Sequence, residues 1–295
     1  MTESNNLGHD MAQVLVKAQS IRLTHHHVYQ RLAGMIDDKE NRRVLERIAD
    51  HEIEHYRSWQ EYIGQDVEPN RLKIKGYVWL AKILGLTFSV QLMRREEDRA
   101  QRMYELVAAR MPSVRHLVKA DEEKREDELI EMLDEESQHY VSSMVLGLDD
   151  ALIEFAAELA ALTLILQDTL LIGAAGLVIG IVTLLSMGAS EYLAAESEEN
   201  GQSPLKSALY TGITGIFTLI LLVLPFFLVE EHVTALILTL VIAIITICIF
   251  SFYVSVVKSL NFKRRFIQMT LVMLGMLSAT FITVFIIHWF LDSGA

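Results

Sequence analysis

The amino-acid sequence predicts an all-α protein, in which a soluble four-helix bundle precedes a membrane domain of five spanning helices. Hydrophobic residues make up 52% of the 295 residues and the mean hydropathy is +0.30, which is too apolar for an ordinary soluble domain of this length. The apolar residues are unevenly distributed, because charged residues are dense up to Leu146 and long apolar runs begin at Leu152. Leu, Ile, Val and Met recur at helical spacing, and no useful stretch alternates with a period of two residues. We therefore expect helices in both halves.

The first half is expected to form the bundle. Its breaks fall at Asp37-Asp38, between Gly64 and Pro69, and at Pro112. The expected helices cover residues 10–35, 39–63, 76–110 and 113–136. Four amphipathic helices bury their apolar faces most economically as a four-helix bundle.

The second half contains five apolar runs that are long enough to cross a bilayer. They cover residues 148–166, 169–194, 205–229, 233–257 and 266–291. Residues 1–11 lack the basic and apolar regions of a cleaved signal peptide, so we expect the soluble half to stay in the cytosol. With the soluble half in the cytosol, five spans place the connection between the fourth and fifth spans on the cytosolic side of the membrane. That connection carries Lys258, Lys263, Arg264 and Arg265, as the positive-inside rule requires.

Carboxylates lie inside the first expected span. Asp150, Glu154 and Glu158 are four residues apart, so they share one helix face, and Asp149 lies beside them. Each carboxylate at depth costs about 2.5–3.5 kcal/mol on insertion scales, which makes such a row a functional signal. The alternative is that Asp149 and Asp150 cap the helix at the interface, but this does not account for Glu154 and Glu158. We interpret the row as a cation path.

The second expected span adds ligands of a different kind. Met187 and Glu191 are four residues apart and share a face, and a thioether beside carboxylates favours transition metals over Mg²⁺ or Ca²⁺. The alternative for Met187 is ordinary packing. Glu196, Glu198 and Glu199 follow at the expected cytosolic mouth, where they either collect cations or solvate a loop.

The second bundle helix contains the motif His51-Glu52-Ile53-Glu54-His55, which has two interpretations. As His-Glu-x-x-His it is a zinc protease signature, although no third ligand is evident. As Glu52-x-x-His55 it is a di-metal motif of helix bundles, which requires inward carboxylates on other helices and finds Glu97 and Glu122. The nearby run of three histidines, residues 25–27, is expected to be largely solvated, since at most one of them can face a given site. The alternative is that His25 supplies a substitute ligand to that site.

The membrane half resembles the vacuolar iron transporter family. The segments that carry the resemblance are LGLDDAL (146–152), LSMGASEYLAAE (185–196), YTG (210–212), Pro225 and FKRRF (262–266). The resemblance implies a five-span, usually dimeric carrier that moves Fe²⁺ or Mn²⁺ out of the cytosol in exchange for protons. It places the metal path at Asp150 and Met187. This chain has Gln268 where many relatives have Glu in the fifth span.

The first half resembles the rubrerythrin branch of ferritin-like proteins in YQRLA (29–33), VLERIA (44–49) and LTF (86–88). Together the two halves resemble the membrane-bound ferritins. An intact di-iron site would require ligands at three positions that are arginine here, namely Arg22, Arg94 and Arg125. The retained ligands would be Glu52, His55, Glu97 and Glu122. We hypothesise that the three guanidinium groups replace the cations and neutralise the three glutamates, so an intact di-iron centre is not expected.

These observations lead to an expected function. Residues 1–140 form a cytosolic ferritin-like domain, and residues 146–295 form a vacuolar iron transporter-like domain that exports Fe²⁺ or Mn²⁺, as a homodimer, across a prokaryotic plasma membrane. The path residues are Asp150, Glu154, Met187 and Glu191. Two alternatives are an exporter whose bundle still oxidises Fe²⁺, and a non-transporting paralogue that acts as a scaffold or metal sensor. The net charge of −12 suits a protein that handles cations and argues against nucleic acid as a partner.

Overall fold

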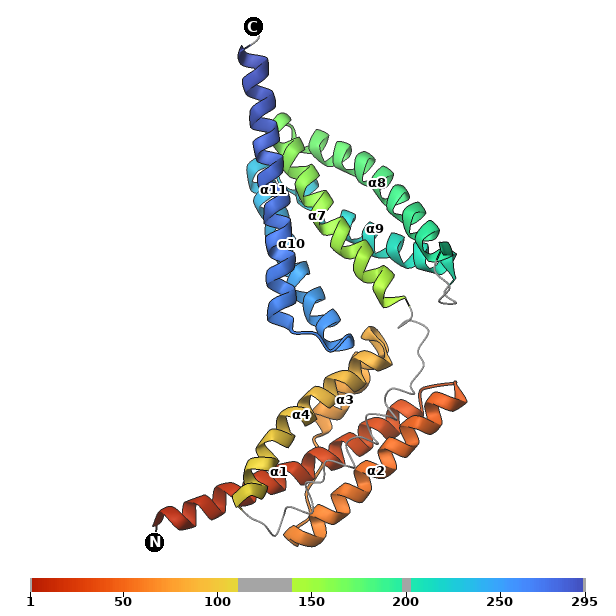
Figure 1. The fold of residues 1–295 in the computed structure, drawn as a ribbon, viewed down its shortest axis with the longest axis vertical. Coiled ribbons are helices and arrows are strands. Elements are labelled where there is room, and N and C mark those ends of the chain that lie inside the picture. The colour runs from red at the N-terminus through yellow and green to blue at the C-terminus, as the bar shows by residue number, and fades with distance from the viewer. Residues whose placement is uncertain (1, 111–139, 198–202, 294–295) are drawn as a thin grey trace. The chain divides into compact units, whose positions relative to one another are not determined.

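The computed structural model describes residues 2–110, 140–197 and 203–293, and every element in these ranges is a helix. The all-α prediction is therefore confirmed for the described residues. The chain divides into two compact units, Met1–Glu135 and Glu136–Ala295, which are shown in Figure 1 and described separately below.

The first unit contains α1 (Thr2–Ala33), α2 (Lys39–Ile63), α3 (Arg71–Leu84) and α4 (Leu86–Arg110). Its core is apolar and joins all four helices through residues such as Tyr29, Leu45, Ile48, Ile74 and Met93. The fourth helix predicted from the sequence, residues 113–136, lies outside the described residues, so the four-helix bundle itself stays a prediction.

Local sequence signals define α2. The Asp38 side chain accepts a hydrogen bond from the Asn41 backbone N–H, which satisfies a donor that the first turn of a helix leaves unpaired. Gly64 ends the helix in the left-handed conformation, with φ of 72°, where glycine costs least. The predicted bounds, residues 39–63, agree with the structure.

The prediction of a single helix over residues 76–110 is wrong. The structure has two helices there, because Gly85 has φ of 92° and interrupts the chain between α3 and α4. The first of them also begins earlier than expected, at Arg71, where the Asn70 side chain accepts a hydrogen bond from the Lys73 N–H, 3.0 Å away.

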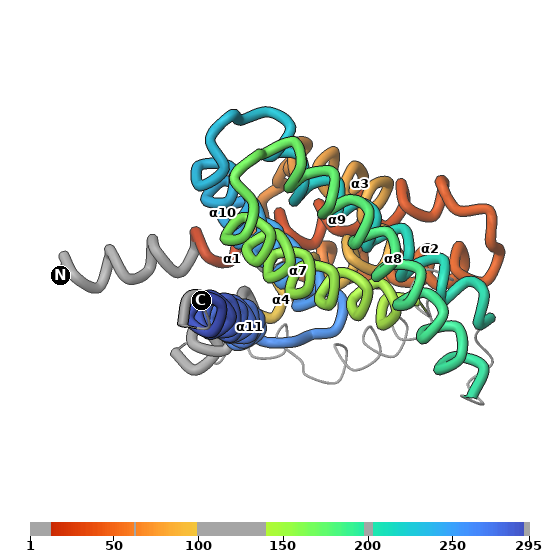
Figure 2. The backbone as a smooth tube through the Cα atoms, turned by 90° about the horizontal axis from the view of Figure 1, so that it is seen from above, coloured from red at the N-terminus to blue at the C-terminus, as the bar shows by residue number. Residues whose placement is uncertain are grey.

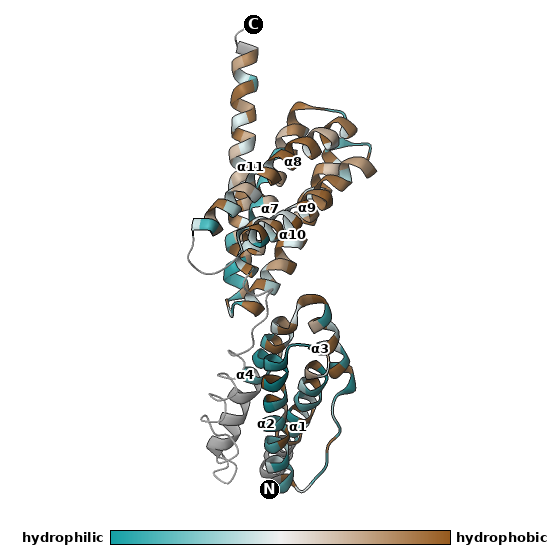
Figure 3. Cartoon of the chain, turned by 90° about the vertical axis from the view of Figure 1, so that its right-hand side faces the viewer, coloured by the Kyte–Doolittle hydropathy of each residue, from teal (hydrophilic) through white to brown (hydrophobic). Residues whose placement is uncertain are grey.

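The second unit contains α7 (Val141–Ile165), α8 (Thr169–Ser197), α9 (Pro204–Leu228), α10 (His232–Val257) and α11 (Phe262–Ser293). Four of these, α8 to α11, are long and apolar enough to cross a membrane, and Figure 3 shows them mostly in hydrophobic colours. The protein is thus an integral membrane protein by the composition of its helices. The fifth expected span, α7, does not belong to this group, because it carries four carboxylates.

Helix α7 nevertheless lies inside the second unit. It packs against each of α8, α9, α10 and α11, and Leu152, Phe155 and Ala156 on it are completely buried. Figures 1 and 2 show α7 running between its neighbours from two directions. Its apolar residues contribute to a continuous core with α9, α10 and α11.

Two contacts bring three chain segments together at one end of this unit. The hydroxyl of Tyr140, just before α7, accepts a hydrogen bond from the Ser203 N–H, just before α9. The Lys258 ammonium, in the connection between α10 and α11, donates to the Ser142 hydroxyl at 2.9 Å. Helices α7, α9 and α11 therefore all begin at this end, and α8 and α10 run in the opposite direction.

Candidate functional site

A cavity of about 600 Å³ lies between α7, α8 and α9. Its lining includes all four residues that the sequence analysis assigned to a cation path, Asp150, Glu154, Met187 and Glu191. The remaining lining residues are Leu146, Val182, Thr183, Ser186, Ser190, Ala194 and Thr211.

Helical spacing places these side chains. Asp150 and Glu154 are one turn apart on α7, and Met187 and Glu191 are one turn apart on α8, so each helix presents one face to the cavity. Asp150, Met187 and Glu191 are half-buried, whereas Glu154 is exposed. Three carboxylates and a thioether around one space form a donor set suited to a divalent transition-metal cation such as Fe²⁺ or Mn²⁺.

The sequence analysis assigned no role to the hydroxyl groups of this cavity. Thr183, Ser186 and Ser190 contribute three of them from α8, and Thr211 contributes one from α9. Thr183 and Ser190 lie on the same helical face as Met187, so their spacing from Met187 in the sequence was enough to predict that they line the same cavity. Thr211 is distant in the sequence and only the packing of α9 on α7 brings it to the cavity.

That packing depends on a glycine. A Cβ atom at Gly147 would lie 2.7 Å from the Thr211 carbonyl oxygen and 2.8 Å from its Cα, both of which are backbone atoms. The Thr211 hydroxyl in turn donates to the Ser143 carbonyl oxygen at 3.0 Å. Gly147 therefore permits the close approach of α7 and α9 that brings Thr211 to the cavity.

Other predicted residues lie elsewhere. Glu158 is not part of the cavity lining, and one of its carboxylate oxygens is shielded from solvent without a hydrogen-bond partner. Asp149 forms an ion pair with Arg265 of α11. Glu196 and Gln268 are exposed, and Glu198 and Glu199 lie outside the described residues.

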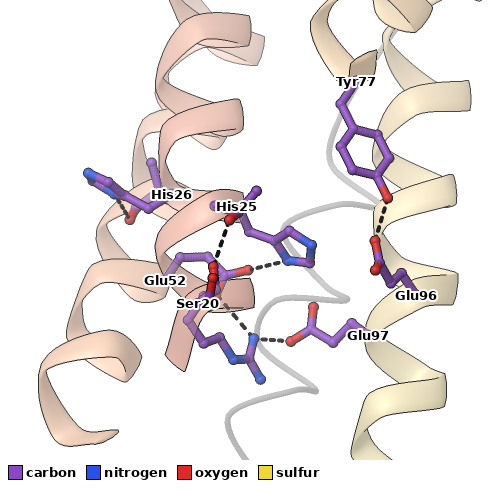
Figure 4. A network of polar contacts seen from close by, with 10 residues as sticks. Ser20, His25, His26, Glu52, Tyr77, Glu96 and Glu97 are labelled. Carbon is purple, nitrogen blue, oxygen red and sulfur yellow. Dashed lines mark hydrogen bonds and ion pairs between the residues drawn. The ribbon is translucent and has the colours of Figure 1, made fainter. Parts of the chain in front are cut away.

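A second polar group occupies the core of the first unit. The Arg22 guanidinium of α1 forms ion pairs with Glu52 of α2, at 3.2 Å, and with Glu97 of α4. The Nδ1–H of His25 donates to the other oxygen of Glu52 at 3.1 Å. Figure 4 shows His25, Glu52 and Glu97 pointing toward one another from three helices.

The charges in this core are buried and paired. Glu52 is completely buried, with 0% of its surface exposed. Burial by itself raises the pKa of the Glu52 carboxyl, but the positive charge of Arg22 and the hydrogen bond with His25 outweigh that effect and hold the pKa below its ordinary value of 4.5. Glu52 is therefore ionised at neutral pH.

The expectation of a largely solvated histidine run is wrong for two of its members. His25 and His26 are only 1% and 8% exposed. The Nδ1–H of His26 donates to the Ala49 carbonyl oxygen at 2.7 Å, which satisfies the buried ring.

The arrangement does not fit the di-metal site that the ferritin-like resemblance implies. His25, Glu52 and Glu97 offer ligand atoms that all lie within 4.8 Å of one another, but the Arg22 guanidinium already contacts both carboxylates. His55 and Arg94 are half-buried, and neither belongs to this group. Glu122 and Arg125 lie outside the described residues. The part of the hypothesis that concerns Arg22 agrees with this geometry, and the part that concerns Arg94 and Arg125 stays a prediction.

The zinc protease interpretation of the His51 to His55 motif gains no support from this geometry. Among the described residues, neither His51 nor His55 belongs to a group that can hold a metal ion. Glu52, the general base of that interpretation, is instead buried against Arg22 and His25.

A further polar contact fixes α3 on α4. Glu96 accepts a hydrogen bond from the Tyr77 hydroxyl at 2.6 Å and forms an ion pair with Lys73. Burial, together with the contact to Glu96, raises the pKa of the Tyr77 hydroxyl. This contact sets the rotation of α3 about its axis.

Comparison with known proteins identifies no relative. No family model matches the chain, and no curated protein or solved structure shows significant similarity to it. The resemblances to vacuolar iron transporters and ferritin-like proteins therefore stay hypotheses that rest on the motifs quoted above.

Proposed function

We propose that this protein is a membrane carrier that exports Fe²⁺ or Mn²⁺ from the cytosol in exchange for protons. The observation that carries the proposal is the cavity between α7, α8 and α9, which gathers Asp150, Glu154, Met187 and Glu191 from two helices. Carboxylates within a membrane domain are costly and usually mark an ion path.

The donor set supports a transition metal as the transported ion. Carboxylate and hydroxyl oxygens alone suit Mg²⁺ or Ca²⁺, whereas a thioether adds a softer ligand. Glu154 is exposed and lies one turn from the half-buried Asp150, so it offers a second carboxylate to an ion on its way to or from Asp150. The same carboxylates bind protons when the metal leaves, which suits metal–proton exchange.

We propose that α7 crosses the membrane as a fifth span, despite its charges. Three of its four carboxylates line the cavity or pair with Arg265, the fourth, Glu158, does neither, and the apolar residues of α7 pack in the core of the unit. Helix α7 begins at the same end as the basic connection between α10 and α11. If that end is cytosolic, as the positive-inside rule favours, the first unit is cytosolic as well.

The first unit is proposed to be an appendage without efficient ferroxidase activity. Arg22 supplies the positive charge that two carboxylates of a di-metal site would otherwise require. A homodimer rests on the resemblance alone, a prokaryotic plasma membrane rests on the acidic composition, and both stay proposals.

Flux measurements in proteoliposomes test the proposal. The chain should carry Mn²⁺ and Fe²⁺ across the bilayer, and Asp150→Asn should reduce that flux by about ten-fold or more, because even residues that only orient metal ligands contribute about 10–100-fold to affinity. Glu230→Gln is the matched control, since Glu230 is an exposed carboxylate between α9 and α10 that does not line the cavity. Equal flux in the native and Asp150→Asn chains would remove Asp150 from the mechanism. The absence of flux in both would favour the non-transporting alternative.

A further inference from the structure

Helix α3 has two apolar faces, although it belongs to the more hydrophilic of the two units. Ile74 and Tyr77 are buried against the core of the first unit. Leu72, Trp79 and Ile83 point the other way and are 82%, 61% and 57% exposed. Trp79 and Ile83 follow Leu72 by seven and eleven residues, so the three share one side of the helix. They form an apolar strip in which Lys75 and Gly76 occupy the turn between Leu72 and Trp79.

The inner contacts hold this strip outward. Glu96 of α4 contacts both Tyr77 and Lys73, and the Ser89 hydroxyl donates to the Tyr77 carbonyl oxygen at 2.9 Å. Rotation of α3 to bury Trp79 would break these contacts and expose Ile74. The exposed strip is therefore fixed by the fold of the first unit.

Cations border the strip along one side. Arg71, Lys75 and Lys82 are exposed, and their helical positions lie next to the line of Leu72, Trp79 and Ile83. With Lys73, the helix carries four cationic residues and no acidic residue, in a chain whose net charge is −12. Figure 3 shows hydrophobic colouring on α3, whereas α2 and α4 are more hydrophilic.

We propose that α3 is an interfacial anchor that binds the surface of an anionic phospholipid bilayer. An amphipathic helix with exposed Leu, Trp and Ile and a basic border inserts its apolar strip at the headgroup level, and its cations face the lipid phosphates. Trp79 is suited to this depth, because its ring is both apolar and a hydrogen-bond donor. The cations beside the strip require a negatively charged binding surface, whatever the partner is. An anionic bilayer supplies that charge over an extended surface. The inference does not depend on metal transport.

Fluorescence of the full chain in nanodiscs tests this anchor. The Trp79 signal is obtained by subtracting the spectrum of the Trp79→Phe variant, and acrylamide, a neutral quencher, reports its exposure. In discs that contain phosphatidylglycerol, the acrylamide quenching constant of Trp79 should fall by about two-fold relative to discs of phosphatidylcholine alone, because an interfacial helix lies about 5–10 Å into the headgroup region. Lipids brominated on their acyl chains should quench Trp79 only in the anionic discs.

Charge reversal supplies the matched pair of variants. Lys75→Glu/Lys82→Glu should abolish the difference between the two kinds of disc, and Arg43→Glu/Arg47→Glu, at exposed positions of α2, should preserve it. High salt should weaken the effect in the native chain, because the Debye length is about 3 Å at 1 M and charges further apart than this are screened from one another. Equal shielding of Trp79 in both kinds of disc would mean that anionic headgroups have no part in covering the strip, and equal exposure in both would mean that nothing covers it. Either result would overturn the proposal.

Discussion

At the scale of single residues, the charged core around Arg22 shows which features could be predicted from residue types and which could not. The replacement of an expected ligand by arginine led to the hypothesis that Arg22 neutralises glutamates, and its ion pairs with Glu52 and Glu97 agree with that hypothesis. The sequence did not reveal that His25 and His26 are buried. Which of three consecutive helical residues faces inward depends on the rotation of α1 against α2, and that is a property of packing.

Loss of the Arg22 charge should destabilise the first unit. Arg22→Met removes the guanidinium that pairs with the buried carboxylates of Glu52 and Glu97, and breaking a buried charge pair costs about 3–5 kcal/mol. Hydrogen exchange of α1 and α2 peptides in the full chain would report the loss as faster exchange. Arg43→Met, at an exposed position of the same unit, is the control and should change little. Unchanged exchange in the Arg22 variant would mean that the pair contributes no net stability.

The lowered pKa of Glu52 predicts how stability depends on pH. A carboxyl whose folded pKa lies below its ordinary value of 4.5 contributes stability above that value, and the contribution is lost as the pH falls through the folded pKa. The unfolding temperature of the first unit, followed by the fluorescence of buried Trp59, should therefore fall as the pH drops below 4.5. Glu52→Gln should flatten that dependence. A slope of the same size in this variant would assign the acid sensitivity to other groups.

At the scale of elements, α2 and the α3–α4 pair show why some helix bounds are predictable. The bounds of α2 follow from Asp38 and Gly64, which act through local hydrogen bonds and backbone conformation. A break at Gly85 was not predicted, because a glycine inside a helical pattern is as compatible with continuation as with a turn. The cavity was anticipated only in part, since spacing aligns Asp150 with Glu154, and Met187 with Glu191, but does not bring Thr211 to them.

The contact between α7 and α9 should be sensitive to a single methyl group. Gly147→Ala places a Cβ against the backbone of Thr211, and overpacking of this kind costs about 1–3 kcal/mol. Gly212→Ala is the matched control, because a Cβ there meets no atom within 4 Å. The thermal unfolding temperature in detergent should fall for the first variant and hold or rise for the second. Equal effects would show that the close approach is not required.

At the scale of the whole molecule, the division into two units follows from composition, whereas the number of spans does not. Charge density and apolar runs differ so strongly between the halves that their separation needs no structural information. In the part of the chain that the structure describes, four helices qualify as spans on apolarity alone. The assignment of α7 as a fifth span stays a proposal, because its carboxylates offset its apolar residues. Its burial among the other helices is a tertiary property.

Single cysteines distinguish five spans from four. In a Cys248→Ser background, cysteines at Glu54, Glu230 and Lys263 would be labelled with a membrane-impermeant maleimide before and after permeabilisation. Five spans place Glu54 and Lys263 on one side and Glu230 on the other. If α7 does not cross, Glu54 should instead be labelled from the same side as Glu230.

The most direct test of the cation path is anomalous scattering from crystals of the full chain loaded with Mn²⁺. The account predicts a manganese peak in the cavity between α7, α8 and α9, within ligand distance of Asp150, Met187 and Glu191. It predicts no peak between Glu52 and Glu97, where Arg22 lies. A peak between Glu52 and Glu97 with none in the cavity would contradict both halves of the account.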